Sequence, residues 1–126
     1  TKAALETGVV PGGGIALLRA SKAIDTLKLE GDELIGAKIV KKACTAPVKQ
    51  IVSNAGLDGT VILSEIEAGG YNMGFNADTD QVEDLIKAGV LDPAKVQKNA
   101  LLYASSTAGI VLLSEALITD AVEEEA

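Results

Sequence analysis

The chain has 126 residues, a net charge of −7 at neutral pH, one cysteine and no histidine. These features exclude an intramolecular disulfide, a histidine-based catalytic triad and a histidine metal site, and no apolar run is long enough to span a membrane. The acidic balance also argues against nucleic-acid binding, because neutralising phosphates requires clustered lysine and arginine.

Amphipathic helical patterns dominate the first half of the chain. A short helix is expected to end at Gly8, and a second one begins near Gly14, where apolar residues recur every three or four positions. A third helix is predicted from Asp32, as its N-cap, to about Asn54. Pro47 falls inside this pattern and lacks a backbone N–H donor, so it is expected to kink the helix.

Helices continue in the second half, together with a minor β element. A short helix is predicted over residues 60–68, and the aromatic and glycine pattern near residues 71–77 indicates a short strand or hairpin piece. Asp78, with Gln81 at the capping-box position, predicts a further helix that ends at Gly89.

A last helix is predicted from Pro93 to about Ala116, with Asp92 as its N-cap. Residues 108–113 are apolar all round, which predicts burial on several sides. Residues 121–126 form an acidic tail. The fold class is therefore mainly α, a helical bundle without an internal repeat or a clear domain boundary.

The first candidate functional element is the sequence Gly8-Val-Val-Pro-Gly-Gly-Gly-Ile, in which Gly12, Gly13 and Gly14 precede a helix start. Glycines before a helix allow a phosphate or nucleotide to approach free backbone N–H groups. From the triplet alone, however, a flexible link between two helices is the better interpretation, because neither a P-loop lysine nor a βαβ pattern accompanies it.

Three further candidates also have ordinary structural interpretations. By spacing alone, Asp92 fits a helix cap better than a sugar contact, and Asn76-Ala77-Asp78 fits a turn followed by a cap. The Asn76 amide is nonetheless able to pair with a purine edge, because it carries both a donor and an acceptor. Cys44 fits a small core residue that no neighbouring base activates.

Five segments follow one another in an order that is typical of one protein family. They are Gly8–Arg19, Ala46–Gly56, Gly74–Ala77, Gly89–Val96 and Thr119-Asp120. Together they span essentially the whole chain and resemble the group I (GroEL-type) chaperonins. The resemblance implies that residues 1–126 are the C-terminal part of the equatorial ATP-binding domain, an incomplete domain that also contacts neighbouring subunits.

The resemblance also assigns residues to a nucleotide pocket. It places Gly13 beside the nucleotide, Asp92 at the ribose, and Asn76, Ala77 and Asp78 at the base. Asp78 departs from the family, which usually has alanine there, and a carboxylate in that place weakens nucleotide binding unless it turns away to cap its helix. Lys98 replaces a frequent arginine. The catalytic aspartate is expected upstream of Thr1, so no catalytic residue and no metal ligand is assigned to this chain.

The implied function is that of an ATP-dependent chaperonin that assists the folding of non-native proteins, with ATP or ADP and Mg²⁺ as cofactors. The implied partners are the other subunits of heptameric rings, with non-native proteins and a co-chaperonin bound through domains that this chain lacks. The implied location is the bacterial cytoplasm, with the mitochondrial matrix or plastid stroma as alternatives.

The start at Thr1 rather than methionine leads us to expect a piece of a longer protein. Such a piece is expected not to hydrolyse ATP by itself and to associate with copies of itself through uncovered apolar faces. The alternative is a stand-alone acidic helical interaction module without a role in nucleotide binding.

Overall fold

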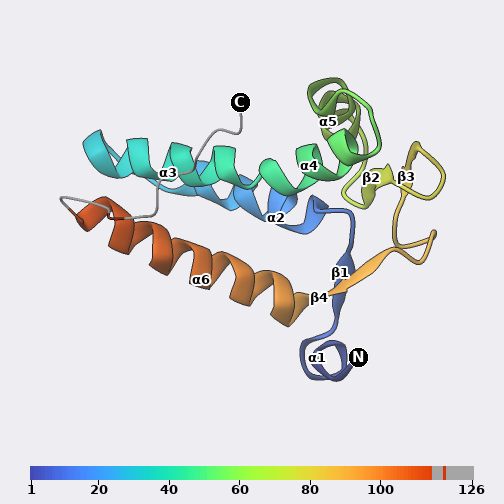
Figure 1. Cartoon of the computed structure of the whole chain (residues 1–126), viewed down its shortest axis with the longest axis horizontal. Coiled ribbons are helices and arrows are strands. Elements are labelled where there is room, and N and C mark those ends of the chain that lie inside the picture. The colour runs from blue at the N-terminus through green and yellow to red at the C-terminus, as the bar shows by residue number, and fades with distance from the viewer. Residues whose placement is uncertain (115–117, 119–126) are drawn as a thin grey trace.

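The computed structural model describes residues 1–114 and residue 118 (Figure 1). The elements follow in the order α1 (Lys2–Thr7), β1 (Val9–Pro11), α2 (Ile15–Ala20), the 3₁₀ helix η1 (Ser21–Thr26), α3 (Gly31–Ala43), α4 (Ala46–Asn54), α5 (Gly59–Ala68), β2 (Met73–Asn76), β3 (Gln81–Asp84), β4 (Leu91–Pro93) and α6 (Ala94–Leu113). The described part is mainly helical, as predicted. The acidic tail, residues 121–126, lies outside the described residues.

Turn and cap residues set several helix ends where the sequence predicts them. Gly8 ends α1 with a φ of 82°, and its N–H donates to the carbonyl of Ala4 at 2.8 Å. Asp58 caps α5, because its carboxylate accepts from the N–H groups of Thr60 at 2.8 Å and Val61 at 3.4 Å. These ends were predictable because each depends on groups only a few residues apart.

The single helix predicted from Asp32 to Asn54 is wrong. The chain forms two helices, α3 and α4, which are separated at Cys44 and Thr45. Pro47 lies in the first turn of α4, where a missing N–H breaks no helical hydrogen bond, so it begins a helix rather than kinking one. Asp32 is in the first turn of α3, whose N-cap is Glu30.

The helix predicted from Asp78 to Gly89 is also wrong, because this segment contains strand β3. β3 pairs antiparallel with β2, in a register that places Asn76 opposite Gln81 and Gly74 opposite Glu83. The hairpin buries Phe75 and Leu85 almost completely. Burial of these side chains outweighs the local capping signal, since each contributes on the order of 2 kcal/mol.

A second small sheet joins two distant parts of the chain. β1 pairs antiparallel with β4, with Val10 opposite Asp92 and Pro11 opposite Leu91. Asp92 therefore lies in a strand, and the prediction that it caps the following helix is wrong. The N-cap position of α6 is occupied by Pro93, which makes no side-chain cap.

The hydrophobic core lies between α2, α4, α5 and the β2–β3 hairpin. Its buried members are Ile15, Leu18, Val48, Val52, Leu63, Ile66, Phe75 and Leu85. Only Phe75 is aromatic, so the core consists mainly of aliphatic side chains. The core residues also fix the positions of the glycine triplet and of the hairpin, which lie at its edge.

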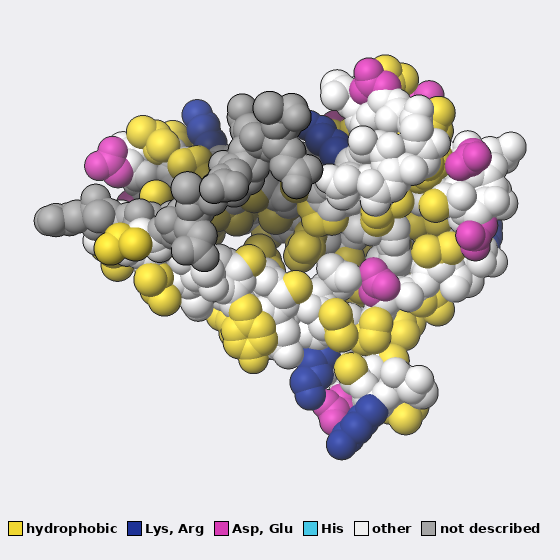
Figure 2. All heavy atoms as spheres, in the orientation of Figure 1, with side chains coloured by type: hydrophobic (Ala, Val, Ile, Leu, Met, Phe, Trp, Pro, Cys, Tyr) yellow, Lys and Arg dark blue, Asp and Glu magenta, His cyan; other side chains and the backbone are white. Residues whose placement is uncertain are grey.

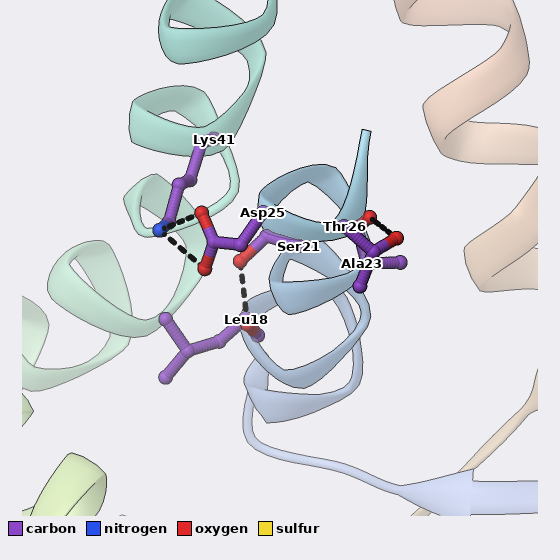
Figure 3. Close-up of polar contacts among 6 residues, drawn as sticks. All are labelled: Leu18, Ser21, Ala23, Asp25, Thr26 and Lys41. Atoms are coloured by element: carbon purple, nitrogen blue, oxygen red, sulfur yellow. Dashed lines mark hydrogen bonds and ion pairs between the residues drawn. The ribbon is translucent and has the colours of Figure 1, made fainter. Parts of the chain in front are cut away.

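The 3₁₀ helix η1 connects this core to α3 (Figure 3). The Nζ of Lys41 in α3 lies 2.6 and 2.8 Å from the carboxylate oxygens of Asp25 in η1. Within the turn, the hydroxyl of Ser21 donates to the carbonyl of Leu18 at 2.6 Å. The ion pair is exposed, so it stabilises the fold by at most about 1 kcal/mol while joining the two elements.

Helix α6 packs along the molecule without burying any of its side chains. The prediction that residues 108–113 are buried is wrong for this chain, since Ile110 is 69%, Leu112 82% and Leu113 88% exposed. Between α6 and the α3–α4 layer lies an apolar hollow of about 640 Å³, and Figure 2 shows hydrophobic side chains around it. Among residues 1–114 and 118, no helix has the length and apolar character needed to cross a bilayer.

Candidate functional site

The glycine triplet lies in a tightly packed part of the chain. A Cβ atom on Gly13, whose φ is 67°, would lie 2.8 Å from Cδ1 of Leu85 and 3.2 Å from the carbonyl oxygen of Phe75. A Cβ atom on Gly14, whose φ is 79°, would lie 2.9 Å from the backbone nitrogen of Val48. Packing within the chain therefore requires glycine at both positions, independently of any ligand.

The helix start after the triplet is a weaker anion site than the sequence suggests. The N–H of Gly12 donates to the carbonyl of Val90 at 2.8 Å, and the N–H of Ile15 donates to the carbonyl of Gly12 at 3.4 Å. Helix α2 has six residues before it tightens into η1. Two N–H groups near the turn are thus already paired, and a short helix adds little dipole.

Asn76 is held at the end of β2, and only 7% of the residue is exposed. Its Nδ2 donates to Oε1 of Glu83 on the neighbouring strand, and its Oδ1 accepts from the backbone N–H of Asp78 at 3.0 Å. Glu83 also accepts from the hydroxyl of Thr79 at 3.4 Å. Each end of the amide retains unused hydrogen-bonding capacity, because Nδ2 carries a second hydrogen and Oδ1 a second lone pair.

Ala77 and Asp78 lie on the exposed turn between β2 and β3. The expectation that the Asp78 carboxylate caps a helix is wrong, because no helix follows it, and its backbone N–H instead supports Asn76. Ala77 lines a small open pocket of about 470 Å³, together with Ile51, Asn54, Ala55 and Asp80.

Asp92 lies in β4 with its side chain partly buried. Its Oδ2 accepts from the side-chain amide of Gln97 at 2.9 Å, one turn into α6. This contact orients the carboxylate but leaves it further lone pairs, so it is able to accept hydrogen bonds from a hydroxyl-bearing ligand.

The two small sheets bring Gly13, Asn76 and Asp92 into one neighbourhood. The triplet contacts Phe75, which precedes Asn76, and it pairs with Val90, which lies two residues before Asp92. Ala77 and Asp78 follow on the same hairpin, at its exposed turn.

Arg19, the only arginine in the sequence, is a structural residue to which sequence reasoning gave no role. It is 6% exposed, and its guanidinium donates to the carbonyls of Ile66 and Gly70 at 2.8 Å and of Tyr71 at 3.1 Å. Arg19 thus ties the end of α5 and the approach to β2 onto α2. The signal in the sequence was a lone arginine at the end of an apolar helical stretch.

Two other predicted residues lie away from this neighbourhood. Cys44 is buried, as predicted, and desolvation by burial raises the pKa of its thiol, which keeps it neutral and unreactive. Lys98 is exposed on α6 beside a pocket of about 530 Å³, which Glu6, Thr7, Ala94, Lys95 and Asn99 also line. Lys95, rather than Lys98, forms the ion pair with Glu6 that joins α6 to α1.

Comparisons with known proteins agree on one family. The model of the TCP-1/cpn60 chaperonin family matches residues 1–121. Chaperonin GroEL 3 of Protochlamydia amoebophila (strain UWE25) is 68% identical over 125 residues, which are 99% of this chain and 23% of that protein.

Solved chaperonin structures have the same fold. A group III chaperonin in the open state superposes with a TM-score of 0.82 at 32% identity, over 92% of this chain and 25% of the other. An open-state monomer of a group II chaperonin from Methanococcoides burtonii gives a TM-score of 0.74 at 27% identity, over 84% of this chain and 28% of the other. The chain thus spans about a quarter of the length of these relatives.

Proposed function

The chain belongs to the TCP-1/cpn60 chaperonin family and is of the GroEL type. We propose that it forms the part of an ATP pocket that contacts the base and the ribose. In this proposal, residues 1–126 are the C-terminal segment of the equatorial domain. Gly13 lies beside the nucleotide, Asn76 with Ala77 and Asp78 faces the base, and Asp92 binds the ribose.

One observation supports this assignment above the others. The glycine triplet contacts both the segment that ends in Asn76 and the segment that leads into Asp92. The triplet thereby meets chain positions about 60 and about 80 residues further along the sequence. Asn76 and Asp92 both keep hydrogen-bonding capacity beyond their internal partners, and an amide and a carboxylate suit a purine edge and sugar hydroxyls.

The metal and the hydrolytic chemistry belong to other parts of the proposed protein. Within residues 1–114 and 118, no group of three or more candidate ligand residues could hold a metal ion. The described residues therefore offer no cluster of protein ligands for the Mg²⁺ that accompanies ATP. We propose that the metal ligands and the catalytic carboxylate lie elsewhere in the complete protein.

The activity of the complete protein is part of the same proposal, because the chain corresponds to only 23% of its curated relative. We propose an ATP-hydrolysing chaperonin that assembles into rings with other subunits and assists non-native proteins, with a co-chaperonin bound outside this segment. We propose a bacterial cytoplasmic location, which the bacterial relative supports. A stand-alone interaction module is not favoured, since 99% of the chain aligns within a much longer chaperonin.

The ribose contact is tested by ATP binding to the complete gene product. Asp92→Ala should weaken ATP binding by about tenfold, because a hydrogen bond to a charged group contributes roughly 1.5 kcal/mol or more. Asp58→Ala is the control, since it also removes a carboxylate but one that caps α5. Titration calorimetry measures both affinities, and an unchanged affinity in Asp92→Ala contradicts the assignment.

The purified 126-residue chain is expected not to hydrolyse ATP, because the proposed catalytic and metal-binding groups lie outside it. Phosphate release by the chain is compared with release by the complete gene product at equal concentration. Turnover by the chain alone that disappears in Asp92→Ala would show that a complete active site lies within these residues.

A further inference from the structure

The orientation of the Asn76 amide is fixed by two neighbours of opposite hydrogen-bonding character. Glu83 is partly buried and offers a carboxylate oxygen, which only accepts, so Nδ2 must face it. The backbone N–H of Asp78 only donates, so Oδ1 must face that side. An amide flipped by 180° would place two donors together and two acceptors together, so a single orientation is stable.

An asparagine amide that cannot flip distinguishes between purines. Adenine presents a donor at its exocyclic amine beside an acceptor at the ring nitrogen, and guanine presents the reverse order, an oxygen acceptor beside a ring N–H donor. In one binding pose, a fixed amide therefore pairs with one of the two purines only. An amide that is free to flip pairs with either.

We propose that Glu83 is a positioning residue that sets base selectivity by locking the Asn76 amide. The inference rests on the proposed function, which places the base at Asn76, and the preferred base is then adenine. Glu83 does not touch the nucleotide in this proposal; it acts through the hydrogen bond that it accepts from Nδ2.

The surroundings of Glu83 make it the side chain that, together with the backbone N–H of Asp78, holds this orientation. It lies on β3 opposite Gly74, which has no side chain, so the carboxylate is free to turn toward the end of β2. There it accepts from both Asn76 and the hydroxyl of Thr79. Because Asn76 is only 7% exposed, water has little access to satisfy its Nδ2 in place of Glu83.

A purely structural role for Glu83 makes a different prediction. If the carboxylate only stabilised the hairpin, its removal would lower the stability of the protein. It would also weaken the binding of ATP and of GTP by the same factor. A locking role instead changes the ratio of the two affinities. The ratio of ATP to GTP affinity is therefore the readout that separates the two roles.

The experiment measures ATP and GTP binding to the complete gene product and to three variants. Glu83→Met removes the acceptor at similar side-chain length, and the ATP preference should fall by at least about fivefold, the lower end of what a bidentate base contact contributes. Glu83→Gln keeps an oxygen acceptor and should retain most of the preference. Glu65→Met on α5 removes an exposed carboxylate and should leave the ratio unchanged.

The outcomes separate this inference from the function on which it rests. If the unmodified protein prefers ATP and Glu83→Met keeps the full preference, the inference is overturned and the proposed function stands. If the unmodified protein binds neither nucleotide, the proposed function fails and the inference fails with it. Should Glu83→Met not fold, Glu83→Val replaces it, because valine favours a strand and cannot accept a hydrogen bond.

Discussion

At the scale of single residues, the glycine triplet shows how one sequence feature meets two demands. Gly13 and Gly14 have positive φ angles, and any side chain there would collide with Leu85 or with the start of α4. The sequence suggested that the missing side chains admit a ligand. The structure adds that the protein itself fills much of that space, so packing requires the triplet independently of any ligand.

Gly13→Ala should lower the free energy of unfolding by about 2 kcal/mol, because alanine is strained at positive φ and its Cβ displaces Leu85. Gly36→Ala is the matched control. Gly36 lies inside α3 with open space around it, so alanine there should stabilise the helix by up to about 1 kcal/mol. Urea denaturation compares the two, and equal effects would contradict the packing argument.

The candidate site was only partly predictable at this scale. The sequence points to Asn76 and Asp92 as candidates, but not to their hydrogen-bond partners, Glu83 and Gln97. Glu83 reaches Asn76 only because the two strands pair, and strand pairing is not encoded in the spacing of the two residues. Gln97 contacts Asp92 because the chain turns from a strand into a helix between them.

At the scale of elements, local signals predicted the helix ends and failed where tertiary contacts decide. Gly8 and Asp58 act on backbone groups within four residues, and both helix ends were predicted. Asp78 and Gln81 carry equally good capping chemistry, yet the segment that follows is a strand. Its Val82 and Leu85 gain more from packing on the core than a short helix gains from its cap.

Arg19 holds two elements together, which makes it the strongest single test of the fold at this scale. Arg19→Met should lower the free energy of unfolding by roughly 3 kcal/mol, because it removes the charged donor shared by the carbonyls of Ile66, Gly70 and Tyr71. Arg19→Lys should recover part of this loss, since an ammonium lacks the planar fork that reaches several carbonyls at once.

Lys22→Met is the control for Arg19, because it removes a cationic side chain that is exposed on η1. It should change the free energy of unfolding by less than about 0.5 kcal/mol. Hydrogen exchange adds a local readout, in which Arg19→Met should accelerate exchange at the end of α5 and in β2. If exchange in these two segments were equally fast in Arg19→Met and in the unmodified chain, Arg19 would not hold these elements together.

At the scale of the whole molecule, the chain divides into a packed region and an apolar surface. The core covers α2, α4, α5 and the hairpin, whereas α6 leaves large aliphatic side chains in contact with solvent. The all-apolar pattern of residues 108–113 predicts burial, and the described residues do not supply the surface that would bury them. The sequence predicts that this face of α6 is buried, but it does not identify the element that buries it.

The purified chain is therefore expected to self-associate with increasing concentration. Apolar patches of this kind on α6 and around the 640 Å³ hollow are uncommon on monomeric proteins. Substituting glutamate for both Leu112 and Leu113 should shift the association to higher concentration, because both leucines are more than four-fifths exposed. Sedimentation velocity measures the shift, and a monomer at every concentration in the unmodified chain would contradict the expectation.

The pairing of β1 with β4 has a consequence for the time course of synthesis. Val10 leaves the ribosome about 80 residues before its partner Asp92. At the usual pace of translation, this is a wait of roughly 4 to 16 s, during which β1 has no strand to pair with. Closing so long a loop is also slow and entropically unfavourable. The glycine turn, the hairpin and β4 are thus expected to meet only after most of this segment has been made, so a nucleotide that binds as we propose would encounter a finished pocket rather than guide its assembly.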